Sequence, residues 1–218
     1  MNPTPREPAQ PPAPPRGVAI SGLVFAVLYI VTLVLVRLAV PADPAEPGEW
    51  LADPALRNRV RVALHLAPFA GIAFLWFMAV LRNRIGLLED RFFATVFLGS
   101  GLLFVAMLFA TVSVAQSVLE TFPFGNPGQS GSYTVSRRMA YSLMNTFGMR
   151  MAAVFMFVTS TIGVRTTVLA RWVSLVGFAC GLVLLLAITD YPWITLLFPF
   201  WALLVSSYIV YSEVHPRP

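Results

Sequence analysis

Long runs without a charged residue dominate the pattern of apolar and polar positions along this chain. Residues 62–81, 92–119 and 191–212 contain no Asp, Glu, Lys or Arg, and a charged residue bounds each run at both ends. A bilayer core of ~30 Å is crossed by about 20 apolar helical residues. The pattern therefore predicts membrane-spanning helices rather than the helices of a soluble core.

Six such helices are predicted, separated by short polar or turn-forming segments. Their approximate ranges are 17–40, 54–82, 92–119, 134–163, 170–189 and 193–211. Asp53 is expected to cap the second helix, with Pro54 in its first position. The fold class is therefore an all-α integral membrane protein with six transmembrane helices in one bundle, which covers residues 17–212 as one domain.

The two ends of the chain depart from this pattern. Residues 1–16 hold seven prolines and little apolar surface, so they are predicted to form a disordered tail. Residues 213–218 form a short C-terminal tail. The first helix is longer than a typical signal-peptide core and is interpreted as a retained span, with cleavage near Ala42 as the alternative.

Composition supports the membrane assignment and removes some functions. Hydrophobic residues make up 57% of the chain and charged residues 11%, whereas a soluble domain carries about 25% charged residues. All basic residues are arginine, which together with the alanine, valine and proline content is typical of a high-GC bacterial genome. Because there is no lysine, a retinal or pyridoxal Schiff base is excluded.

The arginines lie singly near helix ends, which predicts the orientation in the cell membrane. With the N-terminus inside, the inner ends hold Arg6, Arg16, Arg82, Arg84, Arg91, Arg165, Arg171 and Arg217. The outer ends hold the smaller set Arg37, Arg57, Arg59, Arg61, Arg137 and Arg138. This excess predicts that both termini are cytoplasmic. No concentrated basic patch is present, so the lipid bilayer and not nucleic acid is the expected partner.

Arg150 is the strongest candidate for a functional residue. It lies twelve residues after Arg138 and fifteen before Arg165, which predicts a position near the middle of the membrane. Arginine there costs about 2.5–3.5 kcal/mol on the insertion scale and normally faces the bundle interior or a wet cavity. In a functional role Arg150 would hold an anion, a carboxylate or phosphate of a ligand or lipid. The alternative is a structural lock on carbonyls freed by Pro68 and Pro199.

Other polar residues are expected in the same half of the membrane. They are Gln116 and Glu120 on the third helix, Asn145 and Thr146 on the fourth, and His65 on the second. Together they predict an outward-opening polar pocket between the second, third, fourth and sixth helices. The alternative is a set of ordinary interhelical hydrogen bonds.

Two further features bear on packing and on metal chemistry. Gly177 and Gly181 form a GxxxG step on the fifth helix, which predicts close packing on a neighbour. Cys180 is the only cysteine, and the histidines are His65 and His215, so neither a metal site nor bis-His haem is predicted and the cofactor is unknown. A pair formed by His65 and Met144 is the remaining haem or metal alternative.

Three classes of function follow. A non-catalytic subunit or scaffold, with a membrane protein partner or as a homo-oligomer, fits the small extramembrane mass. A binding protein or transporter for a small or lipidic anion would use Arg150. A membrane enzyme is the least supported class, because no nucleophile motif, metal motif or phosphate-binding loop is present.

Overall fold

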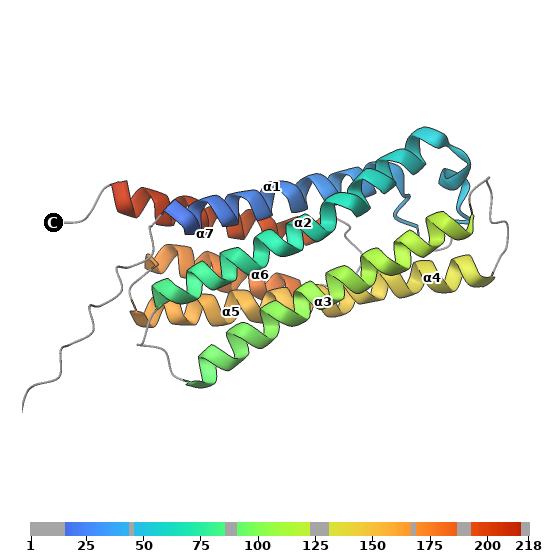
Figure 1. Cartoon of the computed structure of the whole chain (residues 1–218). Helices are drawn as coiled ribbons and strands as arrows, with labels where there is room; N and C mark the ends of the chain where they lie inside the picture. Colours follow the sequence, from blue (N-terminus) through green and yellow to red (C-terminus); the bar gives the residue numbers. More distant parts are fainter. Residues whose placement is uncertain are drawn as a thin grey trace, which may run out of the picture.

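The structure is a computed structural model, and it describes residues 16–43, 46–85, 91–122, 131–166, 169–186 and 193–214. Within these ranges the chain is helical with no β-strand, which confirms the all-α fold. The helices run roughly along one axis and form an elongated bundle (Figure 1). Almost all of the predicted N-terminal tail, and the last four residues of the chain, lie outside the described residues.

The helices follow the predicted order. The first four elements are α1 (Arg16–Ala39), the 3₁₀ turn η1 (Glu49–Ala52), α2 (Pro54–Ile85) and α3 (Arg91–Thr121). The remaining elements are α4 (Gly131–Tyr141), the π-helical segment η3 (Ser142–Gly148), α5 (Met149–Thr166), α6 (Arg171–Leu186), the 3₁₀ turn η4 (Ile194–Leu196) and α7 (Leu197–Val214). Pro54 begins α2, and the Asp53 carboxylate accepts a hydrogen bond from the backbone N–H of Ala55 at 2.7 Å, as predicted.

Five helices are long and apolar enough to cross a membrane, which is compatible with a multi-pass membrane protein. They include the continuous run from Gly131 to Thr166, which corresponds to the predicted fourth helix. The described part of α6 is a shorter apolar helix. The predicted count of six spans is therefore supported for five of them, and residues 187–192 next to α6 lie outside the described residues.

The predicted fourth helix is not a regular α-helix. Between α4 and α5 the seven residues of η3 adopt π-helical geometry, and the backbone N–H of Met149 bonds the carbonyl of Met144, five residues back. A π segment adds a residue to the turn, so side chains after it are rotated relative to those before it. The whole run has 36 residues and is roughly 50 Å long, so it extends well beyond a ~30 Å hydrocarbon core.

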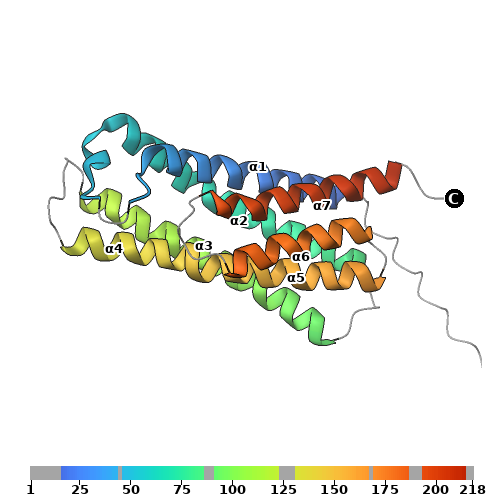
Figure 2. The same ribbon diagram turned by 180° about the vertical axis from the view of Figure 1, so that it is seen from behind.

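The bundle has one part in which α6 and α7 pack on the other helices and a second part that projects beyond them. Helix α1 packs on α2 and α7, α3 packs on α2, α4 and α5, and α5 packs on α6. Helices α1 to α4 continue past the ends of α6 and α7 (Figure 2). The projecting end carries η1 and residues 40–43 and 46–53 and is called the roof end here.

An aromatic core fills the part of the bundle where α7 is present. Phe25 of α1, Phe74 of α2, Phe104 of α3 and Phe198 of α7 are each fully buried. Their ring centroids lie 4.8–5.6 Å apart for most neighbouring pairs, with tilted or edge-to-face geometry. Such pairs contribute about 0.5–1.5 kcal/mol each beyond the area they bury. This core ties α7 to the first three helices.

A smaller hydrophobic cluster lies at the roof end. It contains Ala39, Trp50, Leu51, Val60, Leu64, Val118, Leu119 and Tyr133 and is called the roof cluster. The indole N–H of Trp50 donates to the hydroxyl of Tyr133 at 3.0 Å. Arg57 donates to the carbonyls of Leu119 and Phe122, which are among the unpaired groups at the C-terminal end of α3.

Gly177 and Gly181 both lie against α5, in agreement with the predicted GxxxG packing. A methyl group at Gly177 would collide with the hydroxyl of Ser160 and approach Nε1 of Trp201 to 2.7 Å. A methyl at Gly181 would lie 3.3 Å from the carbonyl oxygen of Ala153. The absence of side chains at these two positions is therefore what allows α6 to approach α5 closely.

The Gly177→Ala variant should unfold at a lower temperature than the wild type. Overpacking of this kind costs about 1–3 kcal/mol, because the buried indole of Trp201 has little room to move. Gly99→Ala on α3 is the matched control, since a methyl there meets nothing within 4 Å. Thermal unfolding of both variants in detergent is the measurement. Equal melting temperatures for the two variants would contradict the proposed close packing.

Candidate functional site: an apolar cavity with arginines at the roof end

A cavity of about 410 Å³ lies between α1, α2, α3, α4 and η3. This volume falls within the range of about 300–1,000 Å³ that is typical of small-molecule sites. Tyr29 and Met144 line its deep end and belong to the same hydrophobic cluster as the aromatic core. The Tyr29 hydroxyl and the Met144 sulfur lie 3.9 Å apart. Trp50 and Tyr133 of the roof cluster line the other end. The cavity therefore separates the two hydrophobic clusters of the bundle.

The walls of the cavity are mainly aliphatic, with residues such as Leu33, Val36, Leu64, Leu108 and Val112. The polar side chains among them bond their own helices. The hydroxyl of Thr32 donates to the carbonyl of Leu28 at 2.8 Å, that of Thr111 to Met107 at 2.8 Å, and the amide of Asn145 to Tyr141 at 3.1 Å. The two hydroxyl donors and one of the two amide N–H donors of Asn145 are thus occupied, so the walls offer mostly apolar contact.

Charge enters the cavity only as arginine. Arg37, Arg137 and Arg138 line it, whereas no Asp or Glu is among the described lining residues. Arg137 is neutralised by Glu46, with 2.7 Å between the guanidinium and the carboxylate. Arg138 is exposed. The cavity therefore carries a net positive charge on its described lining.

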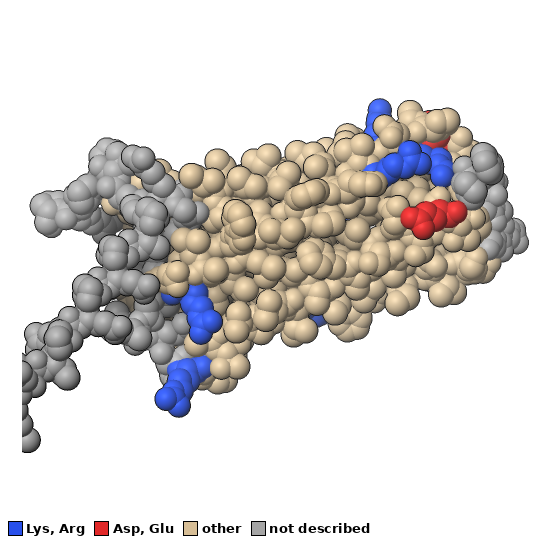
Figure 3. All heavy atoms as spheres, viewed as in Figure 1, with Lys and Arg blue, Asp and Glu red and all other residues tan. Residues whose placement is uncertain are grey.

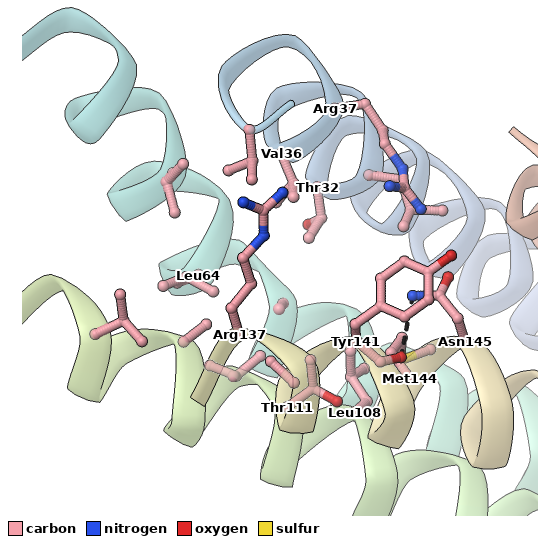
Figure 4. A pocket seen from close by; sticks show the side chains of 18 of the residues that line it. Thr32, Val36, Arg37, Leu64, Leu108, Thr111, Arg137, Tyr141, Met144 and Asn145 are labelled. Atoms are coloured by element: carbon pink, nitrogen blue, oxygen red, sulfur yellow. Dashed lines mark hydrogen bonds between the residues drawn. The ribbon is translucent and has the colours of Figure 1, made fainter. Parts of the chain in front are cut away.

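Arg37 is the arginine whose position is most unusual. It is half-buried in the last turn of α1, and its titratable neighbours are the phenols of Tyr141 and Tyr29 rather than carboxylates. Figure 4 shows its side chain reaching from α1 toward Tyr141 and Asn145 on the opposite wall. A guanidinium in this setting favours an anion that brings its own negative charge into the cavity.

Arg137 has a different role. Its guanidinium bonds the carboxylate and the carbonyl of Glu46 and the carbonyls of Pro41 and Asp43, at 2.6–3.0 Å. The Tyr133 hydroxyl donates to the same carboxylate oxygen, Oε2 of Glu46, at 3.3 Å. Arg137 therefore fastens the segment after α1 onto α4 and closes the roof over the cavity.

The structure brings only one of the six predicted ligand-binding residues to the cavity, namely Asn145. Gln116 bonds Glu120 at 2.9 Å on the surface of α3, and the exposed His65 bonds the carbonyl of Arg61 at 2.7 Å. Thr146 contributes its carbonyl to Arg150, outside the cavity. A ligand-binding role for the other five residues stays a prediction, because they do not line this cavity.

Arg150 does not face the bundle interior, contrary to the expectation from the sequence. It is exposed and donates to the carbonyl of Thr146 at 2.8 Å, so the carbonyls near Pro68 and Pro199 are not its partners. Two physical reasons account for the difference. First, the π segment rotates the side chains after it, including Arg150, relative to those before it. Second, the run that begins with α4 is longer than the hydrocarbon core is thick, so Arg138 does not mark the membrane boundary. About 20 residues counted from Arg165 reach only Asn145.

The observed cavity also differs from the predicted pocket in position and chemistry. It lies between the first four predicted helices instead of the second, third, fourth and sixth, and its walls are apolar instead of polar. Arg37 was counted among the charges that set orientation, because a single arginine after an apolar run is ordinary at a helix end. The linear sequence does not reveal which residues face Arg37 in the folded bundle, and so it does not show that the described ones include no Asp or Glu.

Few of the described lining residues carry groups that are common in acid–base or nucleophilic chemistry. Among the described lining residues there is no Asp, Glu, His or Cys that could serve as a general base or nucleophile. In the part of the chain that the structure describes, no group of three or more His, Cys, Asp or Glu residues could hold a metal ion. Comparison of the chain with protein-family models, with curated proteins and with solved structures finds no match.

Proposed function

We propose that this protein binds an amphiphilic anion, a molecule with a carboxylate or phosphate head and an apolar body, in the cavity at the roof end. The observation that carries the proposal is the half-buried Arg37, which faces an apolar cavity without a carboxylate among the described lining residues. Apolar walls would take the body of the ligand. Arg37 would take its head.

The energetics favour such a ligand over either of its parts. Burying apolar surface contributes about 25 cal/mol per Å², so an aliphatic chain that fills the cavity gains several kcal/mol. A hydrogen bond to a charged group contributes about 1.5–3 kcal/mol more. A small inorganic anion would lack the first contribution and a neutral hydrocarbon the second.

The level of the site along the bundle supports the same chemistry. Arg37 lies about 20 residues along α1 from Arg16, which is the length that crosses a hydrocarbon core. The same count from Arg165 reaches Asn145, which faces Arg37 (Figure 4). These two counts support the proposal that this level lies at the membrane interface, where lipid head groups lie. On the face shown in Figure 3, most of the visible charged side chains lie near the two ends of the bundle, and only a small basic area lies between them.

A role as a subunit or scaffold of a membrane assembly remains a prediction and is compatible with ligand binding. The exposed Arg150 and the exposed Phe147 beside it form a surface that a neighbour or a lipid could cover. The cavity is the more specific feature, because its volume, its apolar walls and its charge converge on one ligand chemistry.

Filling the cavity tests the proposal. Ala115 of α3 lines the cavity and is half-buried, whereas Ala106 of the same helix is exposed. The purified protein should be labelled within the cavity by a photoreactive fatty acid, and far less by the matching fatty alcohol. The Ala115→Trp variant should lose most of this labelling, while Ala106→Trp should keep it. Equal labelling of the two variants, or of the acid and the alcohol, would refute the proposed site.

A further inference from the structure

We propose further that the ligand is an anionic membrane lipid, which reaches the cavity sideways from the bilayer through a seam between α1 and α4. The seam is the line along which α1 faces α4 and η3 at the roof end. This inference rests on the proposed function and adds to it the source of the ligand and its route.

The packing of the helices around the cavity locates the seam. Helix α1 packs on α2, α2 packs on α3, and α3 packs on α4 and η3. Between α1 and α4 or η3 the described residues form no comparable backbone packing, although side chains of both sides line the cavity. The ring of helices is therefore closed by side chains alone at this position.

The last two helices leave the seam uncovered by their described residues. Helix α7 packs along α1 lower in the bundle, and the described parts of α6 and α7 end well short of the roof end (Figure 2). No described residue of either helix lines the cavity. At the level of Arg37 the described residues of α6 and α7 therefore leave the seam uncovered.

The route from the aqueous side is closed by a different and stronger set of contacts. Arg137 holds the carbonyls of Pro41, Asp43 and Glu46 and pairs with the Glu46 carboxylate. Trp50 and Tyr133 are buried beneath these contacts and bond each other. Opening the roof would break charge-assisted hydrogen bonds, whereas parting the seam would separate side chains and, at its deep end, break the weak hydrogen bond from Tyr29 to Met144.

Charge and apolar surface at the seam match an entering lipid. Arg37 projects from one side of it toward Tyr141 and Asn145 on the other (Figure 4). Beside it the lining is apolar, with Leu33 and Val36 on α1 and Ala140 and Met144 on α4 and η3. A lipid of the leaflet at the roof end could move an acyl chain between these apolar groups while its phosphate stays at interface level beside Arg37. The predicted orientation makes this the outer leaflet.

A cross-link across the seam tests the route. In a Cys180→Ala background, the pair Val36→Cys and Ala140→Cys faces across the seam, and a short bismaleimide would bridge it. The control pair Gly71→Cys and Phe109→Cys joins α2 and α3, where these two residues lie against each other and neither lines the cavity. Both proteins are reconstituted into vesicles that contain a photoreactive phosphatidylglycerol or the matching phosphatidylcholine.

The seam cross-link should reduce labelling of the cavity by phosphatidylglycerol at least tenfold, while the control cross-link should leave most of it. Phosphatidylcholine should label weakly throughout. If the seam cross-link does not reduce labelling from vesicles, lateral access is wrong. The proposed function is unaffected by that result. If the bridge does not form, Ala140→Trp narrows the seam instead, and unchanged loading in that variant has the same consequence.

A second probe separates failure of the route from failure of the site. A photoreactive short-chain fatty acid in detergent is small enough to diffuse in past the bridge and should label the cavity in both cross-linked proteins. Absence of cavity labelling by this acid and by phosphatidylglycerol in the unmodified protein would refute the proposed function, and the lateral route with it.

Discussion

Replacing Arg37 by glutamine should lower the affinity for a photoreactive fatty acid by about 10- to 100-fold. A hydrogen bond to a charged partner contributes about 1.5–3 kcal/mol, and each 1.4 kcal/mol corresponds to a factor of ten in the dissociation constant. Glutamine keeps a polar side chain of moderate length but not the charge. Affinity for the matching neutral alcohol should change little, since the apolar walls are unaltered.

Two other arginines serve as controls for this prediction. Arg138→Gln should weaken binding of the acid less than Arg37→Gln does, because Arg138 is exposed and its charge is screened by water and salt. Arg150→Gln should leave binding unchanged, because Arg150 lies outside the cavity. An Arg150→Gln variant that loses binding while Arg37→Gln retains it would restore the assignment made from the sequence.

Replacing Arg137 by alanine should destabilise the protein by about 3 kcal/mol. The Arg137 and Glu46 side chains are only 14% and 12% exposed, so removal of one partner leaves the other buried without its counter-charge. The carbonyls of Pro41 and Asp43 lose their donor as well. For a chain of this size we expect the melting temperature to fall by roughly 6–12 °C, as measured by thermal unfolding in detergent.

Matched variants separate the roof contacts from a general charge effect. Glu46→Gln keeps an acceptor for Arg137 and should cost less than Arg137→Ala. Arg59→Ala removes an exposed arginine from α2 and should change the melting temperature by no more than a degree or two. If the Arg137→Ala and Arg59→Ala variants had the same melting temperature, the contacts of Arg137 described above would not be what holds the roof end.

The elements that the sequence predicts well are those that depend on hydropathy and local capping. The uncharged runs place α2 and α3 closely, and Asp53 followed by Pro54 marks the start of α2. These signals are local, because the length of an apolar run and the chemistry of a helix terminus act within a few residues. Long helices are thus the part of the fold that one-dimensional reasoning captures.

The candidate site depends on which side chains of different helices face each other, and the sequence predicts this less well than it predicts the helices themselves. Arg150 was assigned to the interior because its depth and face were derived from a regular helix, and η3 breaks that regularity. Arg37 was not singled out, because the lack of acidic residues around it concerns α2, α3 and α4 together. Arg57 and Arg137 were counted as topological charges, although each binds backbone carbonyls far away in sequence.

Native mass spectrometry of the protein, gently extracted from its own membranes, tests the central claim most directly. The account predicts a reproducible bound mass that corresponds to an acidic lipid in the wild type and is strongly reduced in Arg37→Gln. Arg150→Gln should carry the same mass as the wild type. A wild-type protein without a bound amphiphile, or one whose bound mass is unchanged in Arg37→Gln, would contradict a lipidic anion held by Arg37.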